Sequence, residues 1–222
     1  MSTNRIFSLL FLLCAFFALF SFALYSLLYL VGDFTGLTSL VNLFSVDLEN
    51  SIPTWFSAQV LFLCAAVLYL IFVNRRNLTG GFTRLWLGLA LVFLAFSVDE
   101  IVSFHEGIVG VTLHNAFNLS GILYFGWVVP AAAFILFFAV IYLRLFLNLP
   151  SRTRWLFLLS GFVYVGGALG LELVGGYYFD LYGGENIVYA GITTIEEAME
   201  MVGAVLFLYA LVDYLNLRSP AF

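Results

Sequence analysis

Lysine is absent from this 222-residue chain, and charge of either sign is scarce. All eight basic residues are arginines, and charged residues make up 9% of the sequence, against about 25% in an ordinary soluble domain. Without lysine the chain cannot form a retinal or substrate Schiff base, a pyridoxal-phosphate anchor or a phosphate-binding loop of the usual kind. The formal net charge of −5 and the lack of a basic cluster also argue against nucleic acid as a partner.

Hydrophobic residues supply 64% of the chain, and the mean hydropathy is +1.09. A helix that crosses the hydrocarbon core of a bilayer needs about 20 apolar residues, and six stretches meet that requirement. We therefore predict an all-α fold, a polytopic transmembrane six-helix bundle, with residues 1–222 forming a single transmembrane domain in a lipid bilayer. The predicted spans cover about residues 6–31, 54–73, 84–110, 121–147, 155–175 and 188–215, with an outer interfacial segment at about 37–46.

The placement of arginine predicts the orientation of the spans. Every arginine falls on one side of the six-span arrangement, whereas the opposite connections carry acids such as Asp47 and Glu49 and no arginine. The positive-inside rule then places both termini in the cytoplasm, and we expect an integral membrane protein. The arginines are Arg5, Arg75, Arg76, Arg84, Arg144, Arg152, Arg154 and Arg218.

Two further residues carry expectations about the fourth span. Trp127 is expected near its outer end, in the aromatic belt of the membrane interface. Pro130 falls inside the predicted span and is expected to kink it.

Seven carboxyl groups and one imidazole lie inside or at the edge of the predicted spans, where a charged side chain costs about 2.5 kcal/mol or more. A rise of about 1.5 Å per residue places them in one layer, the outer half of the bilayer, where no arginine lies. Because helical residues advance about 100° each, the acids of each helix also share one broad arc. We therefore predict a carboxylate-lined cavity that opens toward the extracytoplasmic face. Its residues are Asp99, Glu100, His105 and Glu106 on the third span, Glu172 on the fifth, and Glu196, Glu197 and Glu200 on the sixth.

Buried acids without a basic partner are either protonated or bound to metal ions. The leading hypothesis is a site for one or two divalent metal ions, iron, manganese or zinc, acting on a small or lipid-soluble substrate as a metal-dependent membrane oxidoreductase or hydrolase. Glu100 and Glu197 would be catalytic proton carriers. The set resembles the donors of helical-bundle di-metal proteins in composition, but their Glu-x-x-His spacing is absent. The predicted ligands are Asp99, His105, Glu106, Glu172, Glu196 and Glu200.

Other hypotheses use the same acids. In a proton- or cation-coupled transporter they would load and release cations in alternating states. In a non-catalytic subunit of a larger membrane complex they would be structural, protonated and hydrogen-bonded, with partner subunits or a homo-oligomer around them.

Three strings of this sequence resemble those of an uncharacterised family of bacterial multi-span inner-membrane proteins. They are residues 97–106, with Asp-Glu-x4-His-Glu, residues 166–172, which end in Glu172, and residues 193–203, with Glu-Glu-x2-Glu-Met. No activity is known for that family. The resemblance implies that these acids and His105 belong together, and that the protein is integral to a bacterial cytoplasmic membrane.

Overall fold

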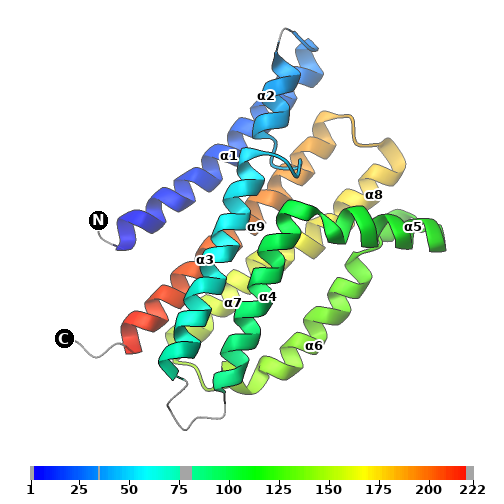
Figure 1. Ribbon diagram of the computed structural model, residues 1–222. Coiled ribbons are helices and arrows are strands. Elements are labelled where there is room, and N and C mark those ends of the chain that lie inside the picture. The colour runs from blue at the N-terminus through cyan, green and yellow to red at the C-terminus, as the bar shows by residue number, and fades with distance from the viewer. Residues whose placement is uncertain (1–2, 35, 76–81, 219–222) are drawn as a thin grey trace.

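The computed structural model describes residues 3–34, 36–75 and 82–218, and within these ranges it contains helices and no strand (Figure 1). Six helical stretches are long and apolar enough to cross a membrane. The predicted all-α, six-span membrane bundle is therefore confirmed. Arg76, one of the arginines on which the predicted orientation rests, lies outside the described residues. The elements are α1 (Thr3–Val31), α2 (Leu37–Phe44), α3 (Ile52–Arg75), α4 (Thr83–Val102), η1 (Phe104–Gly110), α5 (Val111–Phe117), η2 (Gly121–Leu123), α6 (Val128–Leu147), α7 (Ser151–Val165), η3 (Gly166–Leu171), α8 (Glu172–Tyr182) and α9 (Ile187–Arg218).

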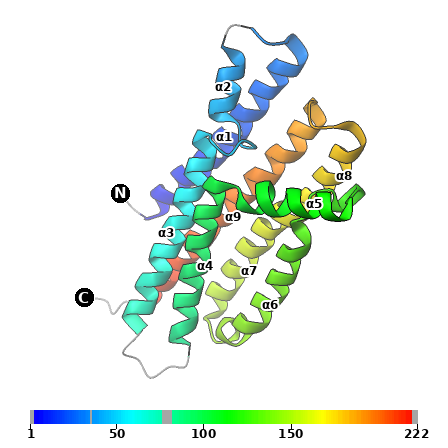
Figure 2. The same ribbon diagram turned by 45° about the vertical axis from the view of Figure 1, so that its right-hand side comes forward.

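The ends of the bundle differ in charge. The last turn of α3, the first turn of α4 and the connection from α6 to α7 lie at one end, and the last turn of α1, the first turn of α2 and the connection from α8 to α9 lie at the other (Figures 1 and 2). The first end holds Arg75, Arg84, Arg144, Arg152 and Arg154, and we call it the arginine end. Its assignment to the cytoplasm stays a prediction.

Helix α9 is the centre of the bundle, because it packs against α1, α3, α7 and α8. The largest buried side chains gather toward the arginine end, where Trp86 stacks on Tyr214 with ring centroids 5.3 Å apart. Leu68 and Ile71 of α3 and Leu211 of α9 complete this apolar layer. Close packing of such side chains makes this part of the molecule a dry core.

The third span ends earlier than its apolar run predicts. Helix α4 ends at Val102, and Ser103 adopts a left-handed conformation with φ 51° while its N–H donates to the Asp99 carbonyl at 2.7 Å. The chain then continues as the π-helix η1 and as α5, which crosses the end of the bundle (Figure 2). The predicted span of residues 84–110 therefore contains a helix end that hydropathy alone does not reveal.

The fourth and fifth spans also differ from their predicted bounds. Helix α6 begins at Val128, so Pro130 lies in its first turn, where a missing N–H costs no hydrogen bond; the predicted kink within the span is wrong. The fifth span runs from Ser151 to Tyr182 and contains the π-helix η3 in its middle.

The segment predicted to lie in the outer interface forms α2, which folds back along α1 (Figure 1). Leu37 and Val41 are buried against Leu24 of α1. Because these contacts hold α2 against α1, the connection from α2 to α3 is directed toward the centre of the bundle end.

Gly203 allows α9 to approach α7 closely. A Cβ atom at Gly203 would lie 2.7 Å from the backbone nitrogen of Tyr164, whereas a Cβ at Gly161 of α7 would meet nothing within 4 Å. We expect Gly203→Ala to lower the free energy of unfolding by about 1–3 kcal/mol through overpacking. The control Gly161→Ala should be neutral or stabilising by up to about 1 kcal/mol, since alanine favours helix. Thermal unfolding in detergent checks both, and equal transition temperatures for the two variants would contradict the close approach.

Candidate functional site

A polar cavity of about 190 Å³ lies between the α2–α3 connection, the end of α4, the π-helix η1, and helices α8 and α9. We call it the acid cavity, because most of the polar side chains around it are carboxyl groups. Its lining consists of Val46, Asp47, Leu48, Glu49, Thr54, Glu100, His105, Glu106, Phe125, Glu172, Tyr189, Thr193, Glu196, Glu197 and Glu200.

The structure brings all but one of the predicted site residues to this cavity. Asp99 is the exception, because its carboxylate lies behind His105 and bonds to it instead of lining the cavity. The remaining predicted residues are Glu100, His105, Glu106, Glu172, Glu196, Glu197 and Glu200.

His105 is held between two carboxylates. Its Nδ1 forms a hydrogen bond with Oδ2 of Asp99, and its backbone N–H donates to Oδ1 of the same residue at 3.2 Å. Its Nε2 lies 3.6 Å from Oε1 of Glu106. The left-handed turn at Ser103 makes this possible, since it brings His105 back toward the last turn of α4. Both ring nitrogens therefore face acidic oxygens, which favours the imidazolium form.

Glu172 and Glu196 meet across the α8–α9 interface. Their carboxyl groups are neighbours in the cavity, and neighbouring carboxyl groups with little solvation share a proton because two ionised carboxylates repel each other. Trp127 donates its indole N–H to Oε1 of Glu172 at 2.6 Å and packs edge-on against His105, with ring centroids 4.4 Å apart. Trp127, expected only as an interfacial anchor, thus links the imidazole to the carboxyl pair.

The acids of α9 face the cavity on one side of that helix. Tyr164 of α7 lies near Glu200 on this side of α9. Gly167 of η3 lies directly against α9, since a Cβ there would be 2.8 Å from the Glu196 carbonyl oxygen. This close approach places Glu172, a few residues further along, opposite Glu196.

Two π-helices border the cavity. The segment η1 carries His105 and Glu106, and η3 immediately precedes Glu172. π-Helical turns are rare and occur preferentially at functional sites. Two of them beside one cavity therefore indicate that this region of the bundle is the functional site.

Asp47 and Glu49, which the sequence places in an outer connection, also line the acid cavity. Their place in the site was not predicted. The carboxyl of Asp47 lies near Thr193 of α9, and that of Glu49 lies near Ser103. Asp47 is exposed as a whole residue, but partial loss of water around its carboxyl group, followed by repulsion from Glu106, raises the pKa of Asp47 to about 6. Burial also raises the pKa of Glu49. The only feature of the sequence that could have indicated this role is that the connection carrying Asp47 and Glu49 is acidic, as are the spans that form the cavity.

No arginine lines the cavity, so His105 is the one basic side chain among its lining residues. Within the described ranges of the chain, no three His, Cys, Asp or Glu side chains are already arranged around a common metal position. The arrangement therefore lends no support to a preformed metal centre at the predicted ligands. What the site offers chemically is a set of carboxyl groups whose negative charge must be balanced by protons or by cations that enter.

The chain belongs to the family described as a domain of unknown function, DUF8692, which matches residues 8–215. The match covers all six spans and every residue of the acid cavity. Neither a curated protein nor a solved structure matches the chain. The family assignment agrees with the resemblance to an uncharacterised family and adds no activity.

The raised pKa of Asp47 predicts a pH-dependent stability. The folded protein binds this proton more tightly than the unfolded chain, whose aspartate has a pKa of about 4. Stability from this group is therefore present below about pH 4 and is lost as the pH rises toward about 6. Asp47→Asn keeps a polar group near Thr193 and removes the titration, so its stability relative to the parent protein should increase between these pH values. Thermal unfolding at a series of pH values measures this difference.

Glu185→Gln is the matched control, because Glu185 is exposed in the α8–α9 connection and lies outside the cavity lining. Its unfolding temperature should follow that of the parent protein across the same range. A stability difference between Asp47→Asn and the parent that stays constant from pH 4 to 6 would show that Asp47 does not titrate as described.

Proposed function

We propose that the acid cavity is the functional site of this integral membrane protein and that it binds a divalent metal ion in exchange for carboxyl protons. The observation that carries the proposal is the close approach of the carboxyl groups of Glu172 and Glu196 in a cavity that no arginine lines. Two carboxyl groups this close share a proton because both cannot ionise without a compensating positive charge. A divalent cation supplies that charge and releases the proton, as metal binding to protonated ligands generally does.

The donor set favours a hard or borderline metal ion. Carboxylate oxygens suit manganese and iron in particular, and zinc is the further candidate expected from the sequence. Glu172 and Glu196 would form the centre of the site, with Glu106 and Glu200 reaching it by side-chain rotation. Asp99 would act by orienting His105, in the way that carboxylates commonly orient metal-bound imidazoles.

Glu100 and Glu197 extend the role of the cavity from binding to chemistry. Both line it, and within the described residues neither side chain has a hydrogen bond to another protein group. Carboxyl groups placed in this way are suited to carry protons to and from a reacting molecule. We therefore propose a metal-dependent oxidoreductase or hydrolase activity on a small or lipid-soluble substrate that reaches the cavity from the end of the bundle opposite the arginines.

The apolar layer of the bundle favours a binding or catalytic site over a transport path. Between the cavity and the arginine end the helices carry no charged side chain that could pass a cation onward. The charge-free stretches are residues 52–74 of α3, 85–98 of α4, 155–171 of α7 and η3, and 201–212 of α9. Moving an ion through such a layer is costly, so the cavity is closed on that side.

Titration calorimetry with manganese or zinc chloride tests the proposal on the purified protein in detergent. Repeating the titration in two buffers that differ in ionisation enthalpy counts the protons released. We expect saturable binding with proton release for the parent protein and at least about a tenfold loss of affinity for Glu196→Gln, equivalent to about 1.4 kcal/mol.

Glu185→Gln again serves as the control and should bind like the parent protein. Binding that is unchanged in Glu196→Gln, or an absence of binding by the parent protein after elemental analysis has shown it to be metal-free, would overturn the proposal. Cation flux in liposomes lost in Glu196→Gln would favour the transporter, and stoichiometric co-purification of another subunit would favour the complex.

A further inference from the structure

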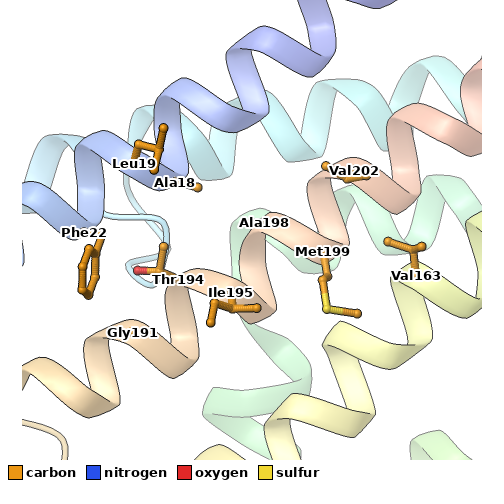
Figure 3. Close-up of a pocket in the computed structure, with 10 residues that line it drawn as sticks. All are labelled: Ala18, Leu19, Phe22, Val163, Gly191, Thr194, Ile195, Ala198, Met199 and Val202. Carbon is orange, nitrogen blue, oxygen red and sulfur yellow. The ribbon is translucent and has the colours of Figure 1, made fainter.

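A second hollow lies on the opposite face of α9 from the acid cavity. It has a volume of about 440 Å³ and is bounded by Leu19 and Phe22 of α1, Val163 of α7, and Ile195 and Met199 of α9 (Figure 3). We call it the lateral groove. Because residues advance about 100° along a helix, the α9 residues of this groove point away from Glu196, Glu197 and Glu200, and α9 separates the two sites.

The groove exists because α1 and α7 share a neighbour without sharing an interface. Both helices pack along α9, but they make little contact with each other. The floor between them is formed by small residues of α9, Gly191 and Ala198, with Ala18 on the α1 side. All of these positions lie within membrane-spanning stretches. The groove is therefore a crevice that faces the hydrocarbon of the bilayer.

The lining offers a hydrocarbon surface and no free polar group. The only side-chain polar group among the lining residues with hydrogen-bonding strength, the hydroxyl of Thr194, donates to the carbonyl oxygen of Ala190 at 2.6 Å. At the rim, Leu19 is 72% exposed and Ile195 is 57% exposed. A ligand here is recognised by shape and apolar contact alone, as in other largely apolar binding sites.

The size of the groove decides between a lipid chain and a helix as its occupant. A helix about 10 Å across displaces roughly 1,300 Å³ over three turns, about three times the volume of the groove. A helix from a second copy could therefore insert only a few side chains. A flexible acyl chain is narrow enough to lie along the floor and fill the space between Phe22 and Val163.

We propose that the lateral groove binds one acyl chain of a membrane phospholipid between α1 and α7. The bound chain completes the packing of α9, which would otherwise leave a void beside Ala198. It fixes the position of α1 relative to α7 without occupying the acid cavity. This site is independent of the proposed metal chemistry, because it uses the other face of α9.

Photolabelling with a phospholipid that carries a diazirine in one acyl chain tests the site in reconstituted vesicles. Mass spectrometry of the digested protein should locate the label on α1 and α9 residues that line the groove. Ala198→Phe fills the floor and should reduce this labelling several-fold. The matched control is Ala133→Phe on α6, where the alanine is exposed and lies outside the groove; it should leave groove labelling unchanged.

Leu19→Trp provides a second variant should Ala198→Phe fail to fold. Because Leu19 is at the exposed rim, a tryptophan there can cover the groove without entering the core, and it should lower groove labelling in the same way. Labelling of the groove no stronger than that of the exposed α6 face, labelling that persists in the folded variants, or cross-linking of two copies through this face would each overturn the proposal.

Discussion

The carboxyl groups of Glu172 and Glu196 meet in a membrane bundle whose sequence has no lysine, in a cavity whose lining includes no arginine. Charge in this setting must be neutralised locally, because the surrounding helices and lipid offer little solvation. His105 balances part of it, and it is itself held between Asp99 and Glu106. The cavity therefore holds more carboxyl groups than basic groups, and the excess negative charge must be balanced by protons or cations. This requirement is the same whichever cation the protein uses in the cell.

The backbone is shaped so that these acids converge. The left-handed turn at Ser103 ends α4 and allows η1 to bring His105 and Glu106 to the cavity. Gly167 lets η3 pack directly on α9, and the connection around Asp47 lines the cavity from another side. Irregular backbone at membrane depth is tolerated where protein or a polar cavity surrounds it. The departures from regular helix are thus concentrated around the cavity, whereas the arginine end is a conventional packed core.

Hydropathy and arginine placement were sufficient to predict the six spans, because both depend on composition and not on detailed packing. The shared depth of the acids on three helices likewise followed from counting residues along each span. The break after Val102 could not be predicted in this way, since Ser103 is not a residue that ends helices by itself. Trp127 and Asp47 were missed for a related reason: their roles depend on how a connection folds over the bundle, and periodicity carries no information about that path.

Infrared spectroscopy of the metal-free protein tests most directly whether unneutralised carboxyl groups define this site. The account predicts a carbonyl stretching band of protonated carboxylic acid at neutral pH, which weakens in Glu196→Gln and disappears when a binding cation is added. A spectrum that contains only ionised carboxylate bands at neutral pH, in protein shown to hold no metal, would contradict it.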